Sequence, residues 1–336
     1  MTRKLSKNMN VLVTGASGFI ATNLTDSFEK SEINVVCIED SNVNRLRKTG
    51  EVCVHRNSED VWAWHLKNLN VDVVVHNAAV VGTDVVALNP AEATLTNVAG
   101  TYNILRACNS TGAAVCYMGT TVIYDTAKYQ NTMIKEDSLL NPTTFYGIQK
   151  LAGERLVKTH ADNWMVMRPL FAYGGVGDMN SLIAKSIFSF KNSRENIDMF
   201  LDPKKVKDYL HVKDYCDAVV LACKKGLWGE DFNVAAETPL PVKEIVDIIS
   251  DELDYDVGRL MKWHPATDYL GNHRLSAEKF SNTSGWSPEI TLENGIKKSI
   301  SDIMSDSSSY NPLSHLDEAR ERNVELSDFF NSNIYY

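Results

Sequence analysis

Short apolar runs rich in β-branched residues alternate with longer helical patterns over the first half of the chain. Strands are expected at Asn10–Thr14, Asn34–Glu39, Val71–His76 and Ala114–Met118. Helical patterns lie between them, near Phe19–Lys30, Val61–Asn68 and Pro90–Ser110. Helices of this length can supply the right-handed crossovers that join parallel strands. The alternation therefore predicts an α/β fold with a doubly wound parallel sheet.

The regular alternation breaks up beyond Arg168. The stretch GGVGD at Gly174–Asp178 and the mixed segment Lys191–Lys207 have the composition of mobile loops. Leu210–Lys225 has the pattern of a strand followed by a core helix, and Asp231–Val234 that of another strand, so the chain is expected to return to the first domain. We therefore expect a first domain of residues 1–172 and about 206–236, a smaller discontinuous lobe of about 173–205 and 237–303, and a polar tail over 304–336.

Composition and charge narrow the class of protein. The 336 residues are 44% hydrophobic and 23% charged, which is typical of a folded globular chain, and the net charge of −9 disfavours nucleic acid or anionic lipid as a partner. No run of about 18 apolar residues predicts a membrane span, and Met1–Asn10 lacks the apolar stretch of a signal peptide. The six cysteines form no CxxC pair and have no zinc-ligand spacing, so no metal site is expected. A cytoplasmic, soluble protein is the simplest interpretation.

The segment NVLVTGASGFIATNL, at Asn10–Leu24, has the pattern of a strand that enters a glycine turn and then an amphipathic helix. In such a turn Gly15 permits the tight bend and Gly18 lets the backbone approach a pyrophosphate, which the helix N-terminus attracts. Ala21 replaces the third glycine of the dinucleotide fingerprint, where a small residue serves for close packing. The turn predicts a dinucleotide site.

Two acidic residues, Glu39 and Asp40, close the next predicted strand, where a ribose-binding acid is expected. A carboxylate at Asp40 would accept hydrogen bonds from the ribose hydroxyls of NAD and repel the extra phosphate of NADP. The nearby Arg45 and Arg47 could neutralise that phosphate, although a solvated helix face explains them as well. NAD is therefore the expected cofactor.

Tyr146 and Lys150 lie four residues apart in a predicted helix and therefore share one of its faces. The ammonium of Lys150 is expected to favour the phenolate of Tyr146, which would make the pair a proton-transfer device. Upstream, Thr120 follows a predicted strand at the carboxyl edge of the sheet and could donate a hydrogen bond to a substrate oxygen. The alternatives are an exposed Tyr/Lys pair and a buried threonine that caps the strand.

The order of these motifs resembles that of the extended short-chain dehydrogenase/reductases, the NAD-dependent epimerase/dehydratase family. The matching motifs are TGASGFI, HNAA, GTTVIY, YGIQK and RPLFAYG, then VKDYLHVKDYCDAVVLAC, DFNVA, NHRLSAEKF and SGWSPEITLENGI, over roughly Asn10–Ile300. The resemblance implies a Rossmann domain for NAD and a C-terminal lobe for the substrate. It also implies an enzyme that acts on a sugar linked to a nucleotide diphosphate, in a homodimer paired through helices at Pro90–Ser110 and Tyr146–His160.

The resemblance assigns roles residue by residue. Tyr146 would be the acid/base, Lys150 would lower the pKa of Tyr146 and hold the nicotinamide ribose, and Thr120 would complete the catalytic set. Cofactor-binding positions would be Gly15, Ser17, Gly18, Phe19, Ile20, Asp40, Asn57, Asn77, Ala78, Ala79, Asn97, Tyr146, Lys150 and Pro169. Substrate-binding positions would be Thr120, Thr121, Phe171, Lys207 and Arg274.

The residues after Thr120 bear on the reaction. Thr121, Val122 and Ile123 stand where family dehydratases usually place an acid, and Val122 where 3,5-epimerases carry a cysteine, so both outcomes are disfavoured. Epimerisation through a transient ketone, most simply at carbon 4, remains the leading hypothesis. A sugar-nucleotide dehydrogenase or ketoreductase and a non-catalytic NAD sensor are the alternatives.

Other positions depart from the family pattern or invite a second role. Phe171 stands where many relatives have an asparagine, and Lys207 where they have an arginine, which leaves a different acidic sugar or carrier as an alternative substrate. Arg274 matches the usual diphosphate-binding arginine. His76 could be a second acid/base, but a satisfied core histidine is the expected role.

Overall fold

The computed structural model describes residues 9–39, 52–53, 58–175, 177–178, 181–192, 197–199, 201–255, 261–264 and 271–305. Its centre is a seven-stranded parallel sheet in the order β11-β6-β5-β4-β1-β2-β3. The strands are β1 (Asn10–Thr14), β2 (Asn34–Glu39), β3 (Val52–Cys53), β4 (Val71–His76), β5 (Ala114–Met118), β6 (Trp164–Pro169) and β11 (Glu230–Val234). The doubly wound α/β fold is confirmed, and the four strands predicted in the first half of the chain have the expected bounds.

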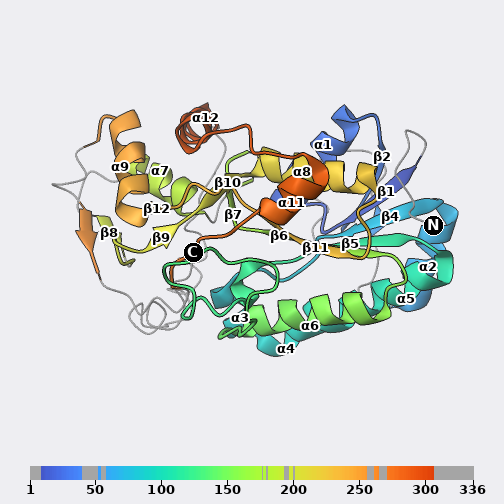
Figure 1. The fold of residues 1–336 in the computed structure, drawn as a ribbon. Helices are drawn as coiled ribbons and strands as arrows, with labels where there is room; N and C mark the ends of the chain where they lie inside the picture. The colour runs from blue at the N-terminus through green and yellow to red at the C-terminus, as the bar shows by residue number, and fades with distance from the viewer. Residues whose placement is uncertain are drawn as a thin grey trace.

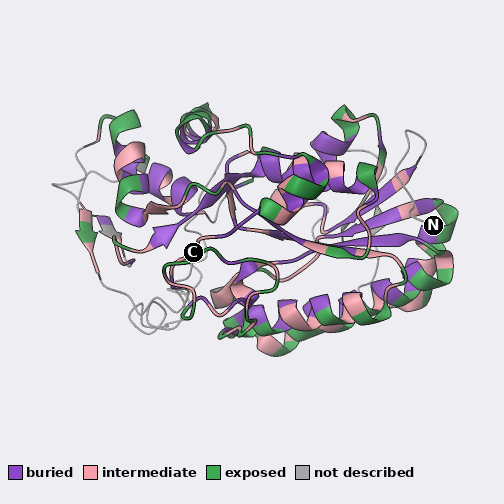
Figure 2. Ribbon diagram, in the orientation of Figure 1, coloured by how far each residue is buried: buried purple, intermediate pink, exposed green. Residues whose placement is uncertain are grey.

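Helices cover both faces of this sheet (Figure 1). One face carries α1 (Phe19–Lys30), α8 (Val212–Lys225) and α11 (Glu278–Ser284). The other carries α2 (Glu59–Asn68), α5 (Thr101–Thr111) and α6 (Phe145–His160). The strands are buried between these layers (Figure 2), because a parallel sheet with helices on both faces exposes neither side to water.

The predicted helix over Pro90–Ser110 is interrupted in the structure. It consists of α4 (Pro90–Thr94), a π-helical segment η2 (Leu95–Gly100) and α5, and it follows the short helix α3 (Thr83–Leu88). A π-helical turn shifts the register of the helix and is often found at functional sites. The next short element, the 3₁₀ turn η3 (Thr121–Ile123), follows β5 at the carboxyl edge of the sheet.

The C-terminal lobe lies at the left of Figure 1 and has its own apolar core. Its helices are α7 (Leu182–Asn192), α9 (Val242–Glu252) and α12 (Leu292–Ser305). Three two-stranded pairs complete the part that the structure describes: β7 (Phe171–Tyr173) with β10 (Tyr209–His211), β9 (Val206–Lys207) with β12 (Leu240–Pro241), and β8 (Ile197–Met199) with β13 (Met261–Trp263).

The expectation of a loop over Lys191–Lys207 is therefore wrong for part of that segment. The end of α7 and strands β8 and β9 lie within it. Each strand is too short to stand out in the sequence, and its hydrogen-bonding partner lies at least 33 residues away in the chain. The return of the chain to the main sheet is seen directly, since β11 pairs with β6 and α8 packs on α1. Within the described residues, none of the helices is long and apolar enough to cross a membrane.

Candidate active site

The glycine turn after β1 packs directly on the chain segment that follows β4. Gly15 has a φ of +67°, and a Cβ atom there would lie 2.8 Å from the Cα of Ala78. The N–H of Gly18 donates to the carbonyl of Gly15 at 3.0 Å, which closes the turn. A Cβ on Gly18 would lie 3.1 Å from that carbonyl oxygen. Both glycines are therefore required by the close approach of backbone to backbone.

Helix α1 starts immediately after this turn and presents its N-terminus at the carboxyl edge of the sheet. Gly18 is its N-cap residue and, in the described part of the chain, no side chain caps this end. The N–H groups of the first helical turn and the helix dipole together favour an anion at this position. Ser17, Phe19 and Ile20 are half-buried here. The turn therefore fits the pyrophosphate of a dinucleotide.

The segment Asn77–Ala79 is held by a chain of hydrogen bonds behind it. The N–H of Ala78 donates to Thr14 Oγ1 at 3.0 Å, and Thr14 Oγ1 lies 2.9 Å from His76 Nδ1. On the other side, His76 Nε2 lies 2.9 Å from the hydroxyl of Thr101, which itself donates to a backbone carbonyl. His76 Nε2 is therefore assigned as the protonated nitrogen.

His76 is a buried neutral histidine rather than a second acid/base. Its side chain is 2% exposed, and both ring nitrogens have hydrogen-bond partners. Burial and then the neighbouring Lys150 lower its pKa from 6.5 to about 3. The expectation of a satisfied core histidine is confirmed.

Asn97, in the π-helical segment, holds the end of the same segment after β4 through hydrogen bonds to Val80. Its carboxamide accepts from the N–H of Val80 at 2.8 Å and donates to the carbonyl of Val80 at 3.0 Å and to Gln149 Oε1 at 2.9 Å. Both amide hydrogens are therefore used by protein partners. Asn97 connects the strand end after β4 to α6, and its expected contact with a cofactor stays a prediction.

Tyr146 lies in the first turn of α6, which Thr144 caps by accepting from the N–H of Gly147 at 3.1 Å. A side-chain hydrogen bond joins Tyr146 to Thr120. Thr120 lies at the end of β5 and also caps η3, accepting from Val122 N at 3.5 Å. The structure thus brings together a tyrosine and a threonine that are 26 positions apart in the sequence.

Lys150 is 5% exposed, and its ammonium is held by β5. Lys150 Nζ donates to the carbonyl of Met118 at 2.7 Å and lies 4.2 Å from the centre of the Tyr117 ring. Burial lowers the pKa of Lys150 to about 7, and the charge of Glu154 opposes part of this shift. Lys150 therefore lies near the midpoint of its titration at neutral pH.

The expected depression of the Tyr146 pKa is not found in this structure. Burial raises the pKa of Tyr146 to about 12, and the hydrogen bond from Thr120 offsets only part of that effect. The reason is that desolvation disfavours the phenolate, while the ammonium of Lys150 is directed to Met118 and Tyr117. Proton abstraction by Tyr146 thus requires further positive charge beside the phenol.

Two of the expected substrate residues, Phe171 and Lys207, come together at the junction with the C-terminal lobe. Lys207 Nζ lies 5.2 Å from the centre of the Phe171 ring and donates to the carbonyl of Gly271 at 3.4 Å. Arg274 follows in the same loop, and its Nε atom is buried with no hydrogen-bond partner among the described residues. His273 was not predicted from the sequence. The centre of its ring lies 5.0 Å from the centre of the Phe171 ring. Burial and then the charge of Lys207 lower the pKa of His273.

The other predicted positions fall into three groups. Thr121 is 2% exposed, so its side chain is packed against protein atoms rather than open to a ligand. Pro169 ends β6 and is half-buried. Asp40 and Asn57 lie outside the described residues, so the preference for NAD over NADP stays a prediction.

Comparison with known proteins identifies the family to which this chain is similar. Residues 11–235, about two thirds of the chain, match the family model described as "NAD dependent epimerase/dehydratase family". A dTDP-glucose 4,6-dehydratase from Haemophilus influenzae is 23% identical over 90% of this chain and 99% of its own length.

Two solved structures have a similar fold. A UDP-glucose 4-epimerase from Thermotoga maritima, solved with UDP-glucose, superposes with a TM-score of 0.79 at 22% identity and covers 88% of this chain and 99% of its own. A Thermus thermophilus UDP-glucose 4-epimerase in complex with NAD superposes with a TM-score of 0.77 at 18% identity and covers 89% and 100%. At these identities the likeness establishes a shared fold.

Proposed function

The chain belongs to the NAD dependent epimerase/dehydratase family, and from this premise we propose that it epimerises a sugar linked to a nucleotide diphosphate. The observation that carries the proposal is the hydrogen bond between Thr120 and Tyr146, with Lys150 one turn along the same helix. An acid/base, a hydroxyl donor and an ammonium are the groups needed to remove and return the proton of a sugar hydroxyl.

Each of these residues has a definite task in the proposed reaction. Thr120 binds and orients the reacting hydroxyl of the sugar. Tyr146 takes the proton as the carbon is oxidised to a ketone and gives it back as the ketone is reduced from the opposite face. Lys150, when protonated, would supply positive charge on the same face of α6 as the phenol and would bind the ribose of the cofactor. NAD, when bound, would supply the acceptor and donor of the hydride and a positive charge that favours the phenolate.

The cofactor is proposed to lie across the glycine turn. Its pyrophosphate would accept from the N–H groups at the start of α1, where Gly15 and Gly18 keep the surface free of side chains. Ala78 and its neighbours in Asn77–Ala79 would line the adenosine half along β4. The same carboxyl edge of the sheet carries Thr120 at the end of β5, so the nicotinamide half would reach the reacting carbon.

The substrate is proposed to be an anionic sugar nucleotide. Lys207 in β9 lies next to Phe171 and would supply one cation, and Arg274, three residues after the Gly271 whose carbonyl Lys207 bonds, would supply a second. The buried Arg274 Nε atom is a donor that a diphosphate oxygen would satisfy. UDP-glucose and dTDP-glucose appear in the names of the related proteins, which supports this class of substrate.

Epimerisation is favoured over dehydration by the residues that follow the proposed donor Thr120. In η3 the side chains of Thr121, Val122 and Ile123 offer no carboxylate to assist elimination, and Thr121 and Ile123 are buried. Net oxidation or reduction by a dehydrogenase or ketoreductase is the second candidate. It differs from epimerisation in consuming or producing NADH.

The test is a screen of UDP-, GDP-, CDP- and dTDP-sugars by NMR, with absorbance at the nicotinamide band recorded in parallel. We expect a change of configuration at one sugar carbon without net NADH formation. Stoichiometric NADH formation would select the dehydrogenase, and loss of water from the sugar would select a dehydratase. Tyr146→Phe is expected to abolish turnover while NAD still binds, and Tyr255→Phe in the C-terminal lobe serves as the control.

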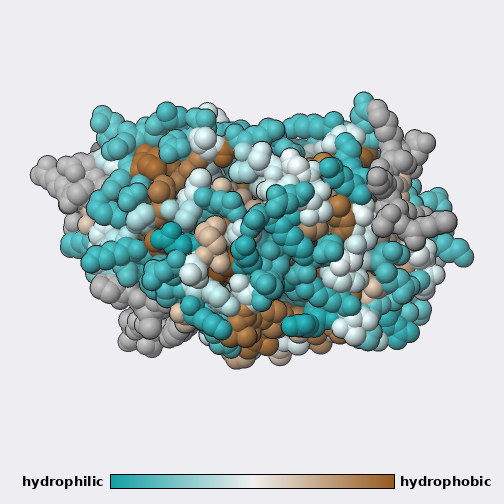
Figure 3. Space-filling view, viewed as in Figure 1, coloured by the Kyte–Doolittle hydropathy of each residue, from teal (hydrophilic) through white to brown (hydrophobic). Residues whose placement is uncertain are grey.

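A homodimer is also proposed. Exposed apolar side chains gather on α3 and the segment just before it, on η2, on α5 and on α6, and α6 packs on the other three elements. They are Val81, Val85, Leu88, Leu95, Tyr102, Phe145 and Ile148, each at least 37% exposed. An apolar area continues along the lower edge of the molecule in Figure 3, where Figure 1 places these helices. A second copy of the chain would bury this surface through the same helices.

A further inference from the structure

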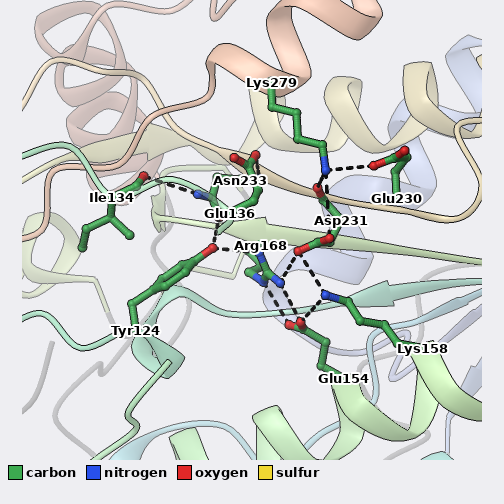
Figure 4. A network of polar contacts seen from close by, with 10 residues as sticks. All are labelled: Tyr124, Ile134, Glu136, Glu154, Lys158, Arg168, Glu230, Asp231, Asn233 and Lys279. Atoms are coloured by element: carbon green, nitrogen blue, oxygen red, sulfur yellow. Dashed lines mark hydrogen bonds and ion pairs between the residues drawn. The ribbon is translucent and has the colours of Figure 1, made fainter. Parts of the chain in front are cut away.

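Arg168 is the centre of a buried polar network at the carboxyl end of β6 (Figure 4). Its side chain is 1% exposed. Arg168 Nε donates to Glu154 Oε2 at 2.9 Å, and Nη2 donates to Glu154 Oε1 at 2.6 Å, which makes a bidentate pair. Nη1 donates to the hydroxyl of Tyr124 at 2.7 Å, and Nη2 also bonds Asp231. Every nitrogen of the guanidinium thus has an acceptor.

The arginine holds the strand end that carries Thr120. A Cβ atom on Gly119 would lie 2.8 Å from Arg168 Cγ, so the backbone before Thr120 lies against the stem of the arginine. Beyond Thr120, the 3₁₀ turn ends at Tyr124, whose hydroxyl accepts from Arg168 and donates to Asn233 Oδ1 at 2.7 Å. The segment is fixed on both sides of Thr120.

The same arginine holds the helix that carries Tyr146 and Lys150. Glu154 lies one helical turn beyond Lys150, on the same face of α6, and is 1% exposed. Burial would raise the pKa of Glu154, but the hydrogen bonds and charge of Arg168 lower it, so the carboxylate stays ionised. A planar guanidinium bonded through two nitrogens fixes the orientation of its partner as well as its distance.

The outer members of the network are more exposed than its centre. Lys158 bonds Glu154 and Asp231 with its side chain 23% exposed, and Lys279 bonds Glu230 with its side chain 36% exposed. They border an open cleft of about 540 Å³ between α6, α11 and the loop after β5. Solvent weakens these outer pairs, so the geometry depends mainly on the inner contacts of Arg168.

We propose that Arg168, held by Glu154 and Tyr124, is a positioning residue that sets the distance between Thr120 and the Tyr146–Lys150 face of α6. The role rests on the proposed function, because Thr120 and Tyr146 are the groups that would touch the sugar. Arg168 touches neither of them with its guanidinium and acts through the two segments that carry them. Glu154 also raises the pKa of Lys150, because its carboxylate is next to Lys150 on α6.

Tyr124→Phe is the first test, because it removes one hydroxyl and leaves the ring and all the charges in place. We expect kcat to fall about ten- to a hundredfold with KM for the sugar nucleotide nearly unchanged, as for a small misplacement of reacting groups. NAD affinity should change little, and the protein should stay folded with a lower unfolding midpoint, because Arg168 Nη1 and Asn233 Oδ1 each lose a buried partner. Lys135→Gln, which breaks the exposed Lys135–Glu278 pair of the same loop region, is the control and should leave kcat unchanged. An unaltered kcat in Tyr124→Phe overturns the proposal.

Glu154→Gln is the second test and needs no substrate. The groups that face Lys150 are Met118 and Tyr117 on β5, His76 on β4, and Tyr146 and Glu154 on α6. Among these only Glu154 is negatively charged at neutral pH, because burial keeps the phenols protonated. In protein with ¹³C-labelled lysine, NMR should show that the pKa of Lys150 falls further below about 7 in the variant. The alkaline limb of the kcat profile should move to lower pH.

The two tests separate this proposal from the proposed function. If no sugar nucleotide is turned over by the unmodified protein, the proposed function fails, and the lysine titration still decides whether Glu154 acts on Lys150. An unchanged titration in folded Glu154→Gln overturns the effect of Glu154 on Lys150, and an unaltered kcat in Tyr124→Phe overturns the positioning role of Arg168. Should Glu154→Gln not fold, kcat in Tyr124→Phe decides it.

Discussion

Gly153, in the middle of α6, is the position where a single methyl group should disturb both stability and the site. A Cβ atom there would clash with the hydroxyl of Tyr117 and lie 3.1 Å from the Cζ atom of the same ring. Tyr117 is 1% exposed, and its ring lies beneath the ammonium of Lys150. Gly153→Ala therefore adds volume at a place where the neighbouring side chain has no room to retreat.

The expected change in stability has two opposing parts. Replacing glycine by alanine inside a helix favours folding by about 1 kcal/mol. Overpacking a buried contact typically costs about 1–3 kcal/mol, and a contact with a ring fixed on all sides belongs at the upper end. We therefore expect Gly153→Ala to lower the free energy of unfolding by about 1–2 kcal/mol. Turnover should also fall. Tyr117 can move only towards Lys150 or towards its own strand β5, and the first of these movements would displace the ammonium of Lys150.

Urea unfolding followed by circular dichroism measures this change. Thr159→Ala, at an exposed position of the same helix, is the control and should raise stability by about 0.5 kcal/mol. Tyr117→Phe removes the clashing hydroxyl, so Gly153→Ala should cost less when it is combined with Tyr117→Phe, with a coupling of about 1 kcal/mol. A Gly153→Ala variant at least as stable as the unmodified protein, or a cycle without coupling, would refute the reasoning.

The remaining predictions concern a histidine cap, the glycine turn, the exposed apolar surface and the substrate residues. His211 caps α8 through Nδ1, and burial lowers its pKa from 6.5 to about 4. As pH falls, His211 is therefore protonated in the unfolded chain before it is protonated in the folded protein. The free energy of unfolding should fall by up to about 3 kcal/mol between pH 6.5 and pH 4. His211→Asn keeps a capping acceptor and should flatten that pH dependence in urea unfolding; an equally steep curve contradicts the assignment. Gly15→Ala should weaken NAD binding at least tenfold by calorimetry, because a Cβ at φ +67° meets Ala78; unchanged affinity contradicts the proposed cofactor site. Ile148→Asp should convert a dimer to a monomer in light scattering with turnover per chain as a second readout, and a dimer that persists shows that this face is not the interface. Lys207→Met should raise KM for a sugar nucleotide about tenfold with kcat nearly unchanged; an unchanged KM excludes Lys207 from the substrate site.

Much of the fold could be predicted from the sequence, because a parallel sheet buried on both faces leaves continuous apolar runs. The bounds of Val71–His76 and Ala114–Met118 were predictable for this reason. The short strands of the C-terminal lobe were not, since β8 consists of three residues, and β13, 62 residues further on, supplies its hydrogen bonds. The interruption of the helix at η2 was also missed, because Asn97 bonds residues that are distant in sequence.

The candidate site, like the fold, could be predicted from the sequence only in part. The spacing of Tyr146 and Lys150 indicated that they share a helix face, but Arg168 and its partners gave only a weak signal. The one available clue was Glu154, an acidic residue four positions after Lys150 on a face that the packing buries. The importance of Arg168 depends on Tyr124 and Asp231, which come from different elements.

The amino-acid sequence by itself determined the local chemistry of this protein. It placed a glycine turn after the first strand, a tyrosine and a lysine one helical turn apart, and a threonine after the strand at Ala114–Met118. Only the tertiary structure decided the charge state of these groups. Burial raises the pKa of Tyr146 to about 12 and lowers that of Lys150 to about 7. The reason is that desolvation depends on what the rest of the chain packs around a side chain, and sequence spacing does not contain that information.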